Sequence, residues 1–192
     1  MNRSAQTMVL LLPVLGLGLA LGTYSLLMPV DALRGWLAAF VWATTIPVGA
    51  LLLLVIHRLT GGDWGAALAP VLSPASKAIL PVALAALPVL VFSRTLYPWQ
   101  APEMPAAVAA HYMNPLFFAV RAVIVFAIWS AFAWIESLRR ARLGAAVCLI
   151  VLAIVTNVAP VDWVVSTKPG FSSSAFGFGF AVEQILAALG FC

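Results

Sequence analysis

Long runs of apolar residues alternate along the chain with short segments that hold most of its charged residues. A run of about 20 apolar residues is long enough to cross the hydrocarbon layer of a bilayer as a helix. Backbone N–H and C=O groups have no water partner in lipid, which favours helices over isolated strands. The pattern therefore predicts an all-α, single-domain bundle of about six transmembrane helices, over residues 8–28, 36–56, 78–96, 115–135, 143–163 and 174–191.

Local signals refine this prediction. Asn114 before Pro115 combines a good N-cap residue with a residue suited to the first helical position, so the fourth helix should begin there. Pro47, Pro81 and Pro88 lie inside predicted helices and should kink them. The connection 57–77 has apolar residues at helical spacing between 64 and 71, which indicates a short interfacial helix.

Composition agrees with the pattern. Apolar residues make up 64% of the chain and charged residues only 8%, whereas a soluble domain carries about 25% charged residues. These values predict a multi-pass integral membrane protein. The net charge of +4 does not indicate nucleic-acid binding, because the basic residues are dispersed over two sides of the membrane without a continuous basic patch.

The distribution of Lys and Arg predicts the orientation. With a cytoplasmic amino terminus, the cytoplasmic side would carry Arg3, Arg58, Lys77, Arg139, Arg140 and Arg142. The opposite side would carry Arg34, Arg94 and Lys168. The positive-inside rule therefore favours cytoplasmic placement of both termini. The cluster at 139–142 should also attract anionic membrane lipid.

The few potential ligands argue against a metal or haem bound by this chain. Cys148 and Cys192 show no CxxC spacing, and we expect free thiols. His57 and His111 should lie on opposite sides of a hydrocarbon layer about 30 Å thick, too far apart to share one haem iron. Two interpretations remain for each histidine. It is an interfacial residue, or it has a functional role as a hydrogen-bond donor to quinone or a proton relay.

Ionisable residues near the hydrocarbon are the candidate functional residues, because each is costly there unless paired or hydrated. Arg121 and Glu183 are expected to be the deepest charges, and Asp162 lies near a helix end. Glu136 lies about 60° around the helix from Arg121, which would extend a polar stripe. Two interpretations remain open: a hydrated proton route through these residues, or an Arg121–Glu183 pair that only fixes helix packing.

Four segments in the same order resemble a known family. They are His57-Arg58-Leu59-Thr60-Gly61-Gly62-Asp63-Trp64-Gly65, Leu96-Tyr97-Pro98-Trp99, residues 114–123 from Asn114 through Arg121, and residues 162–169 from Asp162-Trp163 to Pro169. Together they resemble a haem-free integral membrane subunit of alternative complex III, a quinol:cytochrome c (or electron-acceptor) oxidoreductase. That subunit belongs with the polysulfide-reductase, or NrfD-like, membrane proteins. Family members are longer than this chain, so the resemblance implies a shortened form.

The resemblance implies a role in a respiratory electron-transport complex of the bacterial inner membrane. The chain would pack beside a quinol-binding homologue, while partner subunits carry the haem and iron–sulfur groups. It would catalyse nothing alone, and its buried polar residues would contribute to proton translocation. On this chain those residues would be Arg121, Asp162 and Ser166, with Lys168 and His111 on the periplasmic side. Glu183 is a candidate through its expected depth alone.

Two other functions remain as alternatives. The first is a small independent transporter or channel, whose usual signature is a pair of repeats with broken helices in corresponding positions. No convincing repeat of this kind is visible in the sequence. The second is a purely structural assembly subunit, in which the buried charges serve only as packing pairs.

Overall fold

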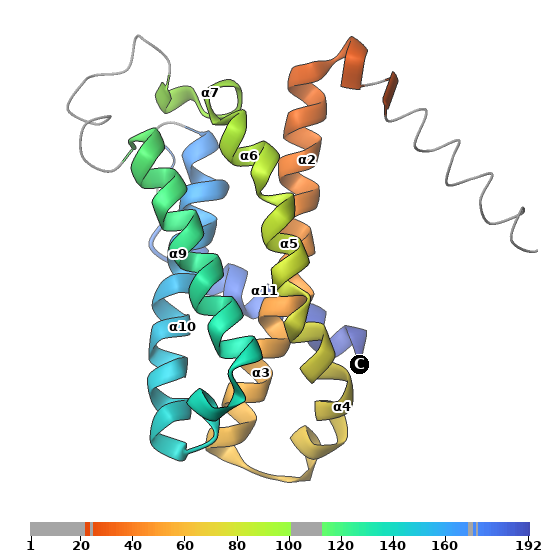
Figure 1. Ribbon diagram of the computed structural model, residues 1–192, viewed down its shortest axis with the longest axis vertical. Helices are drawn as coiled ribbons and strands as arrows, with labels where there is room; N and C mark the ends of the chain where they lie inside the picture. The colour runs from red at the N-terminus through yellow and green to blue at the C-terminus, as the bar shows by residue number, and fades with distance from the viewer. Residues whose placement is uncertain (1–21, 24, 101–112, 169–170, 172) are drawn as a thin grey trace, which may run out of the picture.

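The computed structural model describes residues 22–23, 25–100, 113–168, 171 and 173–192 (Figure 1). Throughout these ranges the regular elements are helical, with no strand. Four helical stretches are long and apolar enough to cross a membrane: Pro29–Thr60, Asp63–Val91, Pro115–Trp134 and Arg142–Thr167. This is the architecture of an α-helical membrane protein. The predicted span 8–28 lies almost entirely outside the described residues.

The first stretch consists of helices α2 (Pro29–Ala43) and α3 (Thr45–Thr60). The predicted span began at residue 36, so the helix starts earlier than expected. The break between α2 and α3 lies where the Pro47 ring opposes the carbonyl of Ala43, four residues earlier. The Thr44 hydroxyl donates to the Val41 carbonyl at 2.6 Å, which offers the backbone a local alternative partner at the break.

The second stretch is formed by α4 (Asp63–Lys77), α5 (Ile79–Ala85) and α6 (Leu87–Val91), followed by α7 (Ser93–Leu96). Its breaks fit the predicted effect of proline, because Pro81 and Pro88 lack the N–H that would bond to Lys77 and Leu84. Residues 63–77, predicted to lie in a connection with a short interfacial helix, form α4 at the start of this long helical stretch.

A two-residue turn explains this difference between prediction and structure. Gly61 and Gly62 adopt positive φ angles of 74° and 93°, a region that glycine reaches without a Cβ clash. The chain therefore reverses at once after α3. The second helical stretch begins at Asp63, whereas the predicted span began at residue 78.

The remaining helices are η1 (Pro98–Gln100), α9 (Pro115–Trp134), η2 (Glu136–Arg139), α10 (Arg142–Trp163), η3 (Val165–Thr167) and α11 (Phe176–Phe191). The predicted start of the fourth span is confirmed, because the Asn114 side chain accepts a hydrogen bond from the Leu116 N–H at 2.9 Å. The helix α11 has 16 residues, or about 24 Å at 1.5 Å per residue. It is shorter than the predicted span 174–191, so the prediction of six spans is not confirmed.

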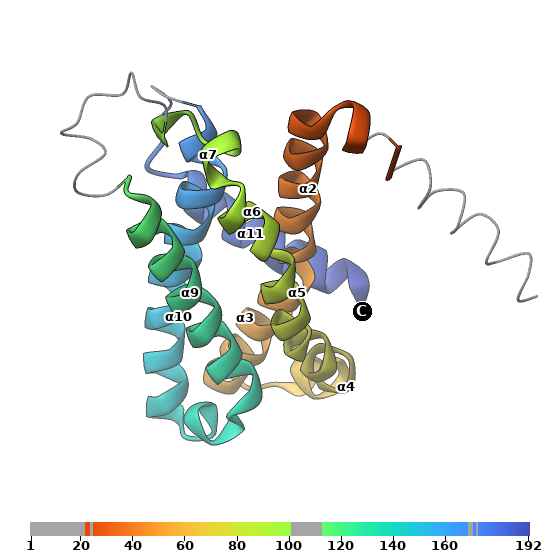
Figure 2. The same cartoon turned by 45° about the horizontal axis from the view of Figure 1, so that its top comes forward.

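Helix α11 runs obliquely across the other helices, and its carboxyl end lies near α4 (Figures 1 and 2). Close contact with α3 is possible because Gly49 has no side chain: a Cβ there would lie 1.8 Å from the Gln184 carbonyl oxygen. Gly177 likewise allows α11 to approach α10 closely, because a Cβ there would lie 2.3 Å from Oδ1 of Asn157. Two glycines therefore set how α11 crosses the bundle.

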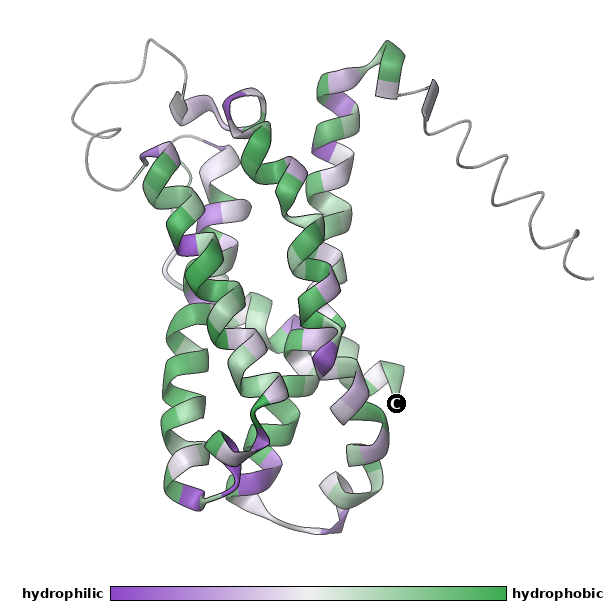
Figure 3. Ribbon diagram, in the orientation of Figure 1, coloured by the Kyte–Doolittle hydropathy of each residue, from purple (hydrophilic) through white to green (hydrophobic). Residues whose placement is uncertain are grey.

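Large aromatic residues fill the interior, and apolar residues also cover much of the outside. The long helices are predominantly apolar along their length (Figure 3). Trp129 and Trp163 are fully buried between α9, α10 and α2. Leu84, Leu143 and Ile154 are more than half exposed on the outer helix faces. A bundle with an apolar exterior over four long helices is suited to lipid contact.

Candidate functional site

A buried ion pair joins α9 to the end of α10. Arg121 Nε donates to Asp162 Oδ2 at 2.6 Å and Arg121 Nη2 donates to Oδ1 at 3.1 Å. The side chains are only 18% and 3% exposed. A planar guanidinium matches the two oxygens of a carboxylate, so this bidentate arrangement fixes the orientation of both groups. The structure thus joins two of the predicted proton-pathway residues, Arg121 and Asp162, in one ion pair.

Ser166 completes the end of α10. Its hydroxyl donates to the backbone carbonyl of Asp162 within the same turn. The last carbonyls of a helix have no backbone partner, and a hydroxyl from the following turn can satisfy one of them. The predicted site residue Ser166 therefore holds the backbone that carries Asp162.

Aromatic rings cover the pair on the side of α7 and η1. The Tyr97 hydroxyl donates to the backbone carbonyl of Trp163 at 3.2 Å, and its ring lies edge-on to Phe118 with a centroid distance of 5.0 Å. Trp99 packs against Phe118 at 5.6 Å. The ion pair next to these rings is largely shielded from water, which strengthens its electrostatic attraction.

Burial raises the pKa of Tyr97 well above its usual value, and the neighbouring Asp162 carboxylate raises it further. Tyr97 lies outside the four candidate spans, next to α7. The phenol therefore stays neutral throughout the physiological range. It remains a hydrogen-bond donor to the end of α10.

A cavity of about 930 Å³ lies next to this cluster, between α2, α7, η3 and α11. Tyr97 and Trp163 belong both to its wall and to the aromatic cover of the ion pair. Among the described residues, three cationic side chains and one carboxylate line it: Arg34, Arg94, Lys168 and Glu183. The predicted residue Lys168 is thus part of the cavity.

Glu183 occupies a different environment from the one expected. It is an exposed residue on the cavity side of α11. The carboxylate bound to Arg121 is Asp162, so the predicted Arg121–Glu183 packing pair was wrong. The reason is the oblique course of α11, which sequence periodicity did not indicate.

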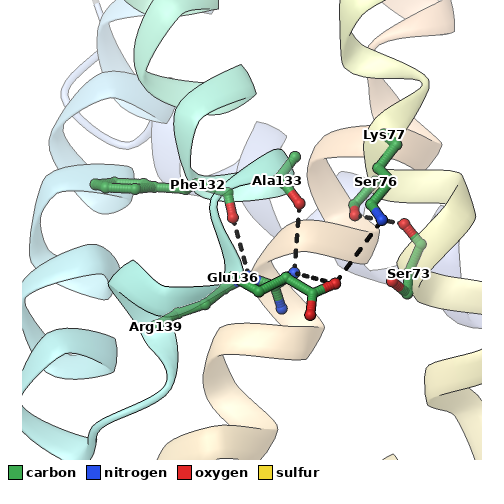
Figure 4. A network of polar contacts seen from close by, with 7 residues as sticks. All are labelled: Ser73, Ser76, Lys77, Phe132, Ala133, Glu136 and Arg139. Atoms are coloured by element: carbon green, nitrogen blue, oxygen red, sulfur yellow. Dashed lines mark hydrogen bonds and ion pairs between the residues drawn. The ribbon is translucent and has the colours of Figure 1, made fainter.

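Glu136 belongs to a polar network far from Arg121, at the other end of α9 (Figure 4). Its carboxylate lies 3.8 Å from Lys77 Nζ and 3.9 Å from Arg139 Nη2. The predicted polar stripe was wrong, because α9 ends at Trp134 and Glu136 follows in η2.

Arg139 holds the end of α9 in place within this network. Its Nε donates to the Phe132 carbonyl at 2.9 Å, and its Nη2 to the Ala133 carbonyl at 3.4 Å (Figure 4). A cation at a helix carboxyl end also interacts favourably with the helix dipole. Burial lowers the pKa of Arg139, and the Glu136 carboxylate opposes this effect. This network stabilises a helix end.

The structure describes only one of the two histidines that the sequence analysis considered. His57 lies in the last turn of α3, as predicted, with its ring edge-on to Trp64 at 5.1 Å. Its ring would lie 2.0 Å from a Cβ at Gly65, so α4 approaches it closely. His111 lies outside the described residues.

No model of a known protein family matches this chain, and no curated protein matches it in sequence.

The described residues offer no clear place for a metal. No group of three or more His, Cys, Asp or Glu side chains is gathered closely enough to hold an ion within them. Cys148 is buried and Cys192 is exposed, and both are free thiols. A cofactor-free chain stays a prediction.

Sequence reasoning missed several residues of this site. Arg34 entered only the count of charges on each side, and Tyr97 only a family-like segment. Arg94 was also an ionisable residue near the hydrocarbon, but it was assigned to no site. A polar signal was present in the sequence, since both arginines flank apolar runs. Their common cavity depends on contacts between elements about 60 residues apart and could not be read from spacing.

Proposed function

We propose that this chain is a haem-free integral subunit of a quinol-oxidising respiratory complex of the alternative complex III type, in the bacterial inner membrane. One observation carries the proposal: three of the four family-like segments converge. Tyr97, from the segment 96–99, contacts Phe118 in the segment 114–123 and Trp163 in the segment that begins at Asp162. The Arg121–Asp162 pair joins the last two segments directly. Segments that resemble a family and also build one buried cluster support a shared structural role.

The geometry favours a role in assembly over a continuous proton route. Arg121, Glu136 and Glu183 lie in three separate clusters, so the route expected through them has no connected path among these side chains. The Arg121–Asp162 pair instead anchors α9 to α10. In this proposal the apolar outer faces contact lipid and a neighbouring membrane protein of the complex, and quinol, haem and iron–sulfur groups belong to the partners.

A small independent transporter is the second candidate, and two observations favour it. The cavity is large enough for a small ligand, and the first helical stretch is broken at Thr44, between the lining residues Trp42 and Thr45. Broken helices beside a cavity are common in transporters. A structural subunit without any proton role would share the geometry of the first proposal.

The deciding experiment is purification of the tagged full chain from native membranes in mild detergent. Co-purifying proteins would be identified by mass spectrometry, and the fraction would be assayed for quinol oxidation. Membranes with the untagged chain serve as the control. We expect haem-bearing and iron–sulfur subunits together with quinol-oxidising activity. Recovery of this chain alone, under conditions that keep respiratory complexes intact, would contradict the proposal and favour the transporter.

A further inference from the structure

Three cations from distant parts of the sequence converge on one cavity. Arg34 comes from α2, Arg94 from α7, and Lys168 follows η3. They are also the cations that the charge count assigns to the side opposite the main basic clusters. These residues therefore contribute positive charge to one cavity, and not only to the charge difference between the two sides of the membrane.

The positive charge of this cavity is poorly balanced within the protein. Arg34 Nη1 lies 3.3 Å from Asp31 Oδ1, but both side chains are more than half exposed, and such pairs are weak. In the described part of the chain, neither Arg94 nor Lys168 forms an ion pair. Glu183 is the single carboxylate that the described residues contribute to the lining. The cavity therefore presents a positive potential to a ligand.

The rest of the lining is apolar and aromatic. Leu37, Val41, Trp42 and Phe180 line it beside the cations. Its volume of about 930 Å³ falls in the usual range of ligand pockets, about 300–1,000 Å³. Such a cavity fits a ligand with an anionic head and an apolar tail.

We propose that this cavity binds one anionic phospholipid. Its phosphate lies between Arg94 and Lys168 with Arg34 nearby, and part of an acyl chain lies against Val41 and Phe180. Basic residues at the ends of membrane helices attract anionic headgroups in this way. A free phosphate would use the cations but leave the apolar lining empty, which is why the lipid is the better occupant. This inference does not depend on the proposed respiratory role.

The test is native mass spectrometry of the full chain, delipidated in a neutral detergent and titrated with phosphatidylglycerol or with phosphatidylcholine of the same acyl chains. Phosphatidylglycerol should bind more tightly. The double variant R94Q/K168Q should lose about 30-fold in affinity for it, as expected for two cations near a headgroup. The control R58Q/K77Q removes two cations that lie away from the cavity and outside the basic cluster at 139–142, and it should change the affinity by about twofold or less.

A second variant keeps the test informative if R94Q/K168Q does not fold, which circular dichroism and gel filtration would reveal. E183Q removes a carboxylate from the lining and should tighten phosphatidylglycerol binding by about fivefold. Any one of four results would overturn the proposal. The two lipids bind equally, both double variants lose affinity equally, the affinity is unchanged in E183Q, or inorganic phosphate displaces the lipid completely.

Discussion

The Arg121–Asp162 pair is the most constrained contact between individual residues in the described part of this protein. Both charges are removed from water, which costs free energy, and the bidentate contact offsets that cost only while both partners are present. Because the two side chains are largely buried, water does not readily replace a missing partner. The pair is therefore sensitive to the loss of one member and tolerant of the loss of both.

We expect R121Q to lower the free energy of unfolding by about 3–5 kcal/mol, because it leaves a buried carboxylate without a countercharge. D162N should have a similar effect, and the double variant R121Q/D162N should recover much of the loss. The measurement is a double-mutant cycle from denaturant unfolding in detergent micelles.

The exposed pair Arg34–Asp31 provides the matched control for this cycle. Its side chains are 68% and 51% exposed, so R34Q, D31N and their combination should show a coupling energy of about 1 kcal/mol or less. Additive losses at Arg121 and Asp162, without recovery in the double variant, would show that the pair does not stabilise the fold as argued.

Sequence reasoning named Arg121, Asp162 and Ser166 but not the contact between them. Polar residues in apolar runs are conspicuous, which is why these three could be singled out. Their pairing could not, because 41 residues separate Arg121 from Asp162 and the choice between Asp162 and Glu183 depends on how the helices cross. Depth along a predicted helix made Glu183 a candidate but did not indicate that it would line the cavity.

At the level of helices, proline and glycine decide shape and contact. The breaks after α2, α4 and α5 are caused by prolines that come a few residues later in the sequence. Glycine allows α11 to approach α3 and α10 at backbone distance. Small residues at helix crossings are a general device in membrane bundles, where van der Waals packing drives association.

Gly49→Ala should destabilise the protein by about 1–3 kcal/mol, because the new methyl group meets the Gln184 carbonyl and the two backbones must separate. Thermal unfolding in detergent would measure the change. Gly179→Ala on α11 is the control, since nothing lies within 4 Å of its added Cβ. It should be neutral or stabilising by up to about 1 kcal/mol. Equal effects of the two substitutions would contradict the close crossing.

In the whole molecule, basic residues gather at two ends with different surroundings. At one end Arg142 Nη2 donates to the Leu59 carbonyl at 3.1 Å, which joins the start of α10 to the end of α3. At the other end Lys168 faces the cavity. The first end carries more positive charge, so we expect it to face the cytoplasm.

Cysteine labelling of intact cells tests this orientation. In a C192S background, which leaves only the buried Cys148, K168C should react with a membrane-impermeant maleimide. R140C should react only after the membrane is opened, because Arg140 is exposed at the opposite end. Both positions labelled from outside, or the reverse pattern, would show that the positive-inside argument fails for this chain.

Apolar run lengths by themselves determined the helical membrane class, and Asn114 with Pro115 determined where α9 begins. These features are local: they depend on lipid being a poor solvent for the backbone and on fixed proline and capping geometry. The tertiary structure decided that residues 63–77 continue into one long helical stretch, that Asp162 is the partner of Arg121, and that Arg34, Arg94 and Lys168 share a cavity. The ion pair and the cavity depend on contacts between elements far apart in the sequence, which the hydrophobic period does not indicate. On one side of the cavity, the crossing of α11 is set by close packing at Gly49 and Gly177.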